Sequence, residues 1–184
     1  HDNMIVVKSF DELRKIIEDR YDKLGPGTEQ DPVDFNDIDV SNLDSFCDEY
    51  DKGLFENTYF KYIDISDWDV SNVRTMNYMF AYCKELKSVG DISYWNVSNV
   101  TNMYCMFLDC KFFNQCISKW DVSKVSNMAY MFYDCKSLWL SASSLFNLTY
   151  CNEAILLNFI KVTLEFCYKF SQMNKILKTA WIKA

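Results

Sequence analysis

The sequence predicts an α/β repeat fold, a short parallel strand–helix solenoid with helical N- and C-terminal caps. One phrase recurs three times without gaps in the middle of the chain. Within this phrase, apolar residues first alternate and then recur at every third or fourth position, as they do where a strand passes into a helix. The segments on either side lack the phrase and have helix-like apolar stripes of their own.

The three clear copies of the phrase each begin at a tryptophan, and the tryptophans are 27 and then 25 residues apart. An isoleucine precedes each tryptophan by three residues, and a cysteine follows each closing phenylalanine by three. Weaker copies at 35–46 and 146–157 are expected of a stacked array, because its terminal repeats face water or a cap. The predicted repeat domain is 35–151, with clear coils over 65–138. The copies run over residues 68–80, 95–107 and 120–132.

One repeat is expected to form a strand, a helix N-cap, a short helix and a return turn. Trp68 and Val70 alternate along the strand and should point inward, which leaves their neighbours facing outward. Ser71 or Asn72 is suited to cap the helix that follows. Stacked repeats would bury continuous columns of like side chains, and the usual crossover preference makes the array right-handed. The apolar residues with helical spacing are Val73, Met76, Met79, Phe80 and Cys83.

The N-terminal segment, residues 1–34, is predicted to be a strand and helix that cover the first coil. A β-branched run ends at Val7, and Ser9 and Glu12 form a capping box ahead of an apolar stripe. Gly25 and the proline after it should end this helix.

The C-terminal segment, residues 152–184, leaves three interpretations open. It is apolar on nearly every face before Ser171, which could cap a second helix with a clean apolar stripe. This segment is either a helical cap, a docking helix for another chain or a membrane surface, or a truncated or frame-shifted tail.

Composition excludes several classes of function for these 184 residues. The formal net charge of −7 argues against a general affinity for nucleic acid or anionic lipid. The one histidine is His1 at the chain end, so histidine-dependent nucleophiles and Cys/His zinc sites are not expected. There is no phosphate-binding glycine loop. The sequence therefore predicts a protein that is not an enzyme and has no cofactor.

Neither a metal site nor a membrane span is predicted. The acidic stretch 29–56 lacks the spacing of a calcium-binding loop and is expected to be solvated. The longest apolar stretch, 155–170, is interrupted by charged residues, and no signal peptide is recognisable in the chain.

The repeated phrase Trp-Asp-Val-Ser-Asn-Val-x-x-Met-x-x-Met-Phe-x-x-Cys closely resembles the BspA-type surface-protein repeats. These repeats are also described as the mycoplasma lipoprotein-associated repeat family of unknown function, and are regarded as relatives of leucine-rich repeats. The resemblance implies a non-enzymatic binding or adhesion scaffold at the cell surface or outside the cell; a cytoplasmic location is the alternative. Cys116 departs from the pattern, since aspartate is usual there.

The cysteines fall into two groups. One cysteine per repeat at an inward position should behave as a small buried hydrophobe with a free thiol, and these are Cys83, Cys110 and Cys135. Cys105 and Cys116 lie off this column and are expected to be more reactive.

The outward positions around the tryptophans form the candidate ligand face. Tyr94 is its expected anchor, because exposed aromatic residues are frequent hot spots of interfaces. The expected partner is a protein that the sequence does not identify, with host and matrix proteins as candidates. The candidate residues are Asp67, Asp69, Tyr94, Asn96, Lys119 and Asp121.

Three other interpretations of this face remain open. It can be an ordinary solvated surface with helix caps, or part of a structural surface-layer or intracellular scaffold protein. A hydrolase that uses an aspartate pair such as Asp67 and Asp69 is the third, but it would need a cleft and a carboxyl group of raised pKa.

Overall fold

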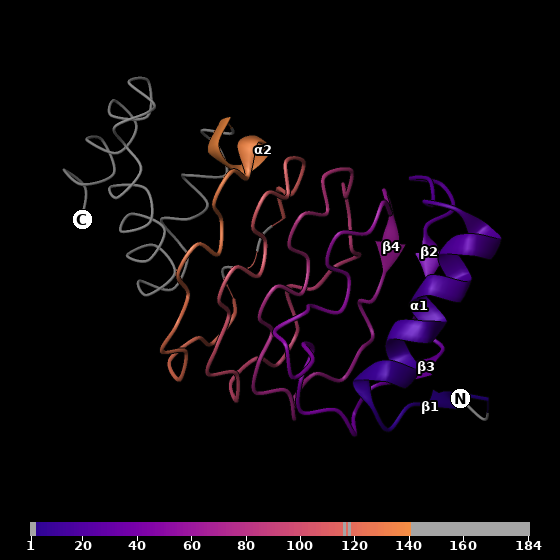
Figure 1. Ribbon diagram of the computed structural model, residues 1–184, viewed down its shortest axis with the longest axis horizontal. Coiled ribbons are helices and arrows are strands. Elements are labelled where there is room, and N and C mark those ends of the chain that lie inside the picture. Colours follow the sequence, from indigo (N-terminus) through magenta and orange to yellow (C-terminus); the bar gives the residue numbers. More distant parts are fainter. Residues whose placement is uncertain (1–2, 116, 118, 141–184) are drawn as a thin grey trace.

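A computed structural model describes residues 3–115, 117 and 119–140. The repeats lie side by side in chain order between an N-terminal helix and a short C-terminal one (Figure 1). The elements are β1 (Ile5–Val6), α1 (Phe10–Leu24), β2 (Val33–Asp34), β3 (Ile38–Asp39), β4 (Ile63–Asp64) and α2 (Lys136–Leu140).

Two small parallel sheets join the N-terminal segment to the first repeats. β1 pairs with β3, with Ile5 opposite Ile38, and β2 pairs with β4, with Val33 opposite Ile63. Because both pairs are parallel and join segments about one repeat apart or more, they stack chain segments side by side rather than forming hairpins.

The helix expected in the N-terminal segment is confirmed as α1. The Ser9 hydroxyl accepts a hydrogen bond from the Glu12 backbone N–H at 3.2 Å, which satisfies one of the free donors of the first turn. Gly25 ends the helix with a φ of 71°, a conformation that glycine adopts readily. Leu13 and Ile17 are fully buried, whereas Leu24 at the last position is 63% exposed.

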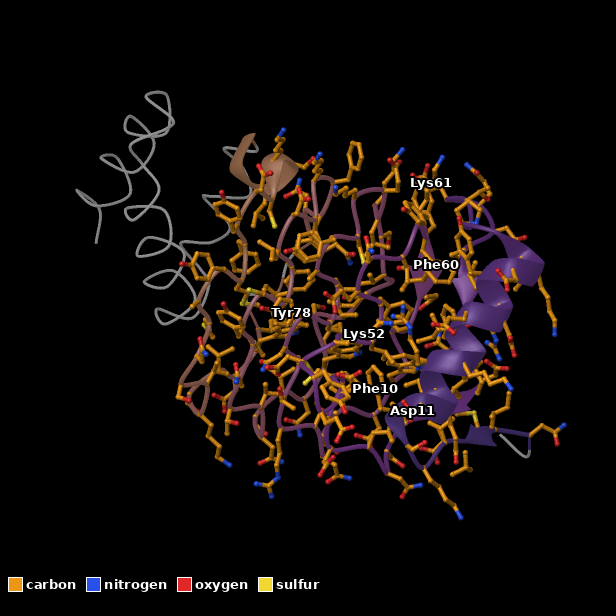
Figure 2. The ribbon with its side chains drawn as sticks, in the orientation of Figure 1. Phe10, Asp11, Lys52, Phe60, Lys61 and Tyr78 are labelled. Carbon is orange, nitrogen blue, oxygen red and sulfur yellow. The ribbon has the colours of Figure 1, made fainter. Side chains whose placement is uncertain are left out.

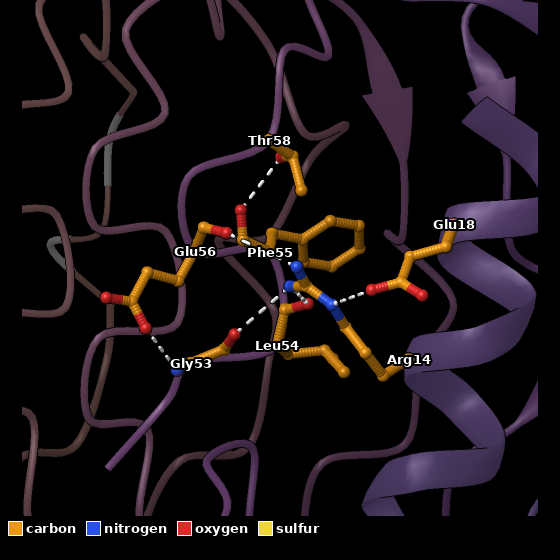
Figure 3. A network of polar contacts seen from close by, with 7 residues as sticks. All are labelled: Arg14, Glu18, Gly53, Leu54, Phe55, Glu56 and Thr58. Atoms are coloured by element: carbon orange, nitrogen blue, oxygen red, sulfur yellow. Dashed lines mark hydrogen bonds and ion pairs between the residues drawn. The ribbon is translucent and has the colours of Figure 1, made fainter. Parts of the chain in front are cut away.

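Arg14 ties α1 to the first repeat (Figure 3). Its guanidinium donates to the backbone carbonyls of Leu54 at 2.6 Å and Gly53 at 3.3 Å, and it pairs with Glu18 at 2.9 Å. The arginine thus satisfies carbonyl groups that an irregular segment would otherwise leave without donors.

The predicted fold class is wrong. The described residues contain two helices and four strands of two residues each, and therefore show neither an α/β strand–helix solenoid nor helical caps at its ends. The residues from Val73 to Cys83, which the apolar spacing predicts to be helical, form tight turns instead. The predicted C-terminal cap, residues 152–184, and the degenerate copy at 146–157 lie outside the described residues.

Left-handed residues explain why no helix forms there. Tyr78 and Tyr82 have φ values of 56° and 60°, outside the right-handed helical region. Each is the third residue of a turn closed by a hydrogen bond, from Met79 N–H to Met76 O at 3.2 Å and from Cys83 N–H to Phe80 O at 3.1 Å. A positive φ at this place is the mark of a type II turn. The equivalent residues of the next two repeats, Cys105, Asp109, Tyr130 and Asp134, also have positive φ.

A parallel ladder of backbone hydrogen bonds joins neighbouring repeats along these turns. In one repeat the N–H groups of residues 76, 78, 80 and 82 donate to carbonyls of residues 102, 104, 106 and 108 at 2.7–3.0 Å. Isolated parallel bridges link Ser45, Thr75, Asn102 and Asn127 in succession. The turns therefore satisfy their backbone groups between repeats, where a helix would satisfy them within itself.

The predicted inward columns are confirmed. Trp68, Trp95 and Trp120 are at most 5% exposed, and Met76, Met103 and Met128 at most 4%. A phenylalanine column stacks nearly face to face from one repeat to the next, with ring centroids 5.3–5.8 Å apart and interplanar angles of 5–11°. Its members are Phe55, Phe80, Phe107 and Phe132. These columns are part of one continuous apolar core.

Candidate functional site

One outward residue in each repeat lies at the tip of the turn that precedes the tryptophan. In each case the tryptophan N–H donates to the isoleucine carbonyl three residues earlier, at 3.1–3.2 Å. The first repeat has the same turn, closed between Ile38 N–H and Phe35 O at 3.1 Å. We call the residues at this place the tip column; they are Asp37, Asp67, Tyr94 and Lys119.

The predicted site residues after the tryptophans shape the backbone. An Oδ1 atom of Asp69 accepts from the Ser71 N–H at 3.0 Å and hydroxyl at 2.6 Å, and Asn96 does the same with Ser98 at 3.1 and 2.6 Å. Asp121 accepts from the Ser123 N–H at 3.0 Å. These are Asx turns, in which a short polar side chain takes the place of a backbone acceptor.

Hydrogen bonding in the Asx turn also affects the charge of the carboxyl groups. The hydrogen bonds from Ser123 lower the pKa of Asp121, since they favour the ionised form. This carboxyl group is therefore more firmly negative than a free aspartate, which is opposite to what a general acid needs.

Tyr94 and Lys119 are the two predicted residues that the structure brings into direct contact. The ammonium Nζ of Lys119 lies 4.3 Å from the centroid of the Tyr94 ring and 3.2 Å from its hydroxyl oxygen. A cation over an aromatic face is attracted by the negative potential of the ring. The tyrosine nevertheless remains 76% exposed, so the pair presents a preorganised aromatic side chain to solvent.

Asparagine side chains hold the outer turns of neighbouring repeats together. The Asn72 amide donates to the Ser41 carbonyl, and the Asn99 amide to the Ser71 carbonyl, both at 2.8 Å. On the outward face, a side chain of one repeat is therefore hydrogen-bonded to the backbone of the repeat before it.

All six predicted ligand-face residues are exposed. Sequence reasoning did not foresee that three of them, Asp69, Asn96 and Asp121, form Asx turns. It also missed a second set of Asx turns before the tip column, in which Asp64 and Asp91 accept from Ser66 and Ser93. The recurrence of Asp-x-Ser was the signal that could have revealed both sets.

The end of the tip column next to α1 is closed by an ion pair. The two terminal nitrogens of Arg20 donate to the two carboxylate oxygens of Asp37 at 2.7 and 2.8 Å. This arginine lowers the pKa of Asp37 by hydrogen bonding to its charged form. Asp37 is therefore already engaged, and the open part of the column begins at Asp67.

The cysteine column consists of free thiols, as the sequence predicts. The Sγ atoms of Cys83, Cys110 and Cys135 donate to phenylalanine carbonyls of the preceding repeat at 2.8–3.0 Å. Burial raises the pKa of the Cys110 and Cys135 thiols, which keeps them in the neutral form.

The greater reactivity expected of Cys105 does not hold. This residue is 3% exposed, and burial raises the pKa of its thiol as well. It occupies a left-handed turn position, which sequence spacing alone did not reveal. Cys116 lies outside the described residues.

The described part of the chain offers neither a metal centre nor a spanning helix. No group of three or more His, Cys, Asp or Glu side chains there is placed to hold a metal ion. Neither α1 nor α2 has the length and apolar composition needed to cross a bilayer.

Comparison with known proteins identifies a family. The family model described as "Mycoplasma protein of unknown function, DUF285" matches residues 49–154, which is more than half of the chain. The match begins just after the weaker copy at 35–46 and includes all three clear copies. No curated protein and no solved structure matches the chain.

Proposed function

The chain belongs to the DUF285 family of mycoplasma proteins of unknown function, and from this premise we propose that it is a protein-interaction or adhesion module. It binds its partner without catalysis, as a repeat unit of a BspA-type surface protein located at the cell surface or outside the cell. The tip column from Asp67 to Lys119 is its binding face.

The observation that supports this proposal is the exposure of Tyr94 on a fixed turn. Tyrosine has few rotatable bonds and a large amphipathic surface, so it loses little conformational entropy when it binds. Lys119 already restricts the ring, and the 76% exposure leaves most of it for a partner. Polar residues surround it on both sides, which resembles the polar rim around an interface hot spot.

The same face offers little to a hydrolase. Asp69 uses an oxygen in its Asx turn with Ser71, and Asp67 and Asp69 are both exposed. Acid catalysis needs a carboxyl group that is desolvated in a cleft, whereas the carboxyl groups of both aspartates face solvent. These features favour binding over catalysis.

The proposal is tested with the full chain and a panel of purified host cell-surface and extracellular-matrix proteins. For any protein bound by the wild type, Tyr94→Ala should weaken binding at least about tenfold, the effect of a hot spot. The free energy of unfolding should change by no more than about 0.5 kcal/mol, as for an ordinary surface substitution.

Tyr50→Ala is the matched control, because Tyr50 is 83% exposed and lies outside the tip column. It should bind like the wild type. Equal affinity of Tyr94→Ala and wild type would reject the tip column as the binding face, and equal loss in both variants would indicate nonspecific adsorption through exposed tyrosines.

A further inference from the structure

An open pocket of about 180 Å³ lies where α1 meets the turn that ends the first repeat. None of the residues that line it belongs to the tip column. The lining residues that matter here are Ile17, Glu18, Tyr21, Asp22, Tyr59 and Phe60.

The walls of this pocket are aromatic and well supported. The Tyr21 and Phe60 rings meet edge to face, with centroids 5.1 Å apart and an interplanar angle of 88°. Ile17 and Phe60 belong to the core and are at most 1% exposed, and Phe60 lies beside α1 (Figure 2). Tyr59 is 61% exposed and forms the outer part of the lining.

Two carboxylates of α1 line the pocket, and they differ in availability. Glu18 is already paired with Arg14 at 2.9 Å (Figure 3). The side chain of Asp22, one helical turn further on, has no hydrogen-bond or ion-pair partner among the residues that the structure describes. The site therefore combines aromatic faces with one available negative charge.

We propose that this pocket binds the guanidinium or ammonium side chain of a basic segment of a partner protein. Aromatic faces and a carboxylate both attract an organic cation, and the aliphatic part of an arginine or lysine can lie along an apolar wall. The volume is below the roughly 300 Å³ at which pockets for small molecules begin, so it suits one side chain rather than a whole ligand. The net charge of −7 favours the approach of a basic partner.

The test measures binding of a fluorescein-labelled hexa-arginine peptide to the full chain by fluorescence anisotropy. Asp22→Asn and Tyr59→Ala should each weaken binding about three- to tenfold, through loss of the charge and of an aromatic face. Two matched controls, Asp19→Asn on the same helix and Tyr50→Ala, should change the affinity less than about twofold. Tyr94→Ala should also leave it unchanged, which separates this site from the tip column.

Thermal melts establish that each variant is folded, which is expected because Asp22 and Tyr59 are exposed. Absence of peptide binding by the wild type would overturn the proposal. An equal loss of peptide affinity in Asp22→Asn and Asp19→Asn would also overturn it, since it would show that the peptide is attracted by the overall negative charge and not by the pocket. Competition by choline at concentrations comparable to the peptide would assign the pocket to small organic cations instead of a protein segment.

Discussion

At the scale of single residues, each tryptophan of the repeats both fills the core and satisfies a backbone carbonyl. The indole Nε1–H of Trp68, Trp95 and Trp120 donates to the preceding repeat, to the carbonyls of Phe35, Ile65 and Ile92, at 2.8–3.3 Å. A buried tryptophan needs such a partner for its N–H. The same contact locks the position of one repeat against the next.

Trp95→Ala should lower the free energy of unfolding by about 3–5 kcal/mol, as large aromatic-to-alanine changes in a core do. Trp95 is 5% exposed, and its ring lies parallel to that of Trp120 at 6.2 Å. Urea denaturation measures the loss, with the exposed neighbour Tyr94→Ala as the control. A loss below about 1 kcal/mol would mean that Trp95 is not part of the core in solution.

At the scale of the element, the helix α1 could be predicted and the turns of the repeat could not. A capping box at Ser9 followed by a single apolar stripe is a specific signature of a helix start. In contrast, two consecutive four-residue turns also place apolar side chains three and four residues apart, so Met76, Phe80 and Cys83 imitate a helical stripe. The deciding quantity is the positive φ of Tyr78 and Tyr82, which tyrosine rarely adopts.

For the candidate site, the sequence predicted which residues face outward but not which of them touch. Alternation around Trp68 and Trp95 correctly placed their neighbours outward, because it depends only on local geometry. The contact of Tyr94 with Lys119 joins residues 25 positions apart. The pocket at Tyr59 joins two segments that only the packing of α1 brings together, and no local pattern reports such contacts.

The attachment of α1 should depend on pH through the pair of Arg20 and Asp37. Since the folded pKa of Asp37 is lowered, the pair stabilises the protein at pH values above the unfolded pKa of about 4. This stabilisation is lost as the pH falls through the folded value. Asp37 is half-exposed, so the effect should be at most about 1 kcal/mol.

Urea unfolding of wild type and Asp37→Asn at pH 7, 5, 4 and 3 measures this contribution. The difference between the two proteins should be constant at the higher pH values and shrink toward zero below pH 4. A difference that grows on acidification would contradict the direction of the pKa shift.

At the scale of the whole molecule, neighbouring repeats are joined by hydrogen bonds at the surface as well as by side-chain packing in the core. The backbone ladder, the asparagine bonds and the phenylalanine column all connect one repeat to the next. A middle repeat has two such neighbours and an end repeat one, so stability is concentrated in the middle. The rigid face on which Tyr94 is held depends on this stacking of turns, and not on helices.

A comparison of Tyr82→Gly with Tyr82→Ala tests that claim most directly. Tyr82 has a φ of 60° and is 39% exposed. Both substitutions remove the same partly exposed tyrosine side chain, so the two variants differ only in the methyl group of alanine. In a left-handed turn, glycine avoids a steric cost of about 1–2 kcal/mol that alanine bears. In a helix the order is reversed, with glycine less stable than alanine by about 1 kcal/mol. Stacked turns predict that Tyr82→Gly has the higher free energy of unfolding in urea, and a higher value for Tyr82→Ala would contradict them.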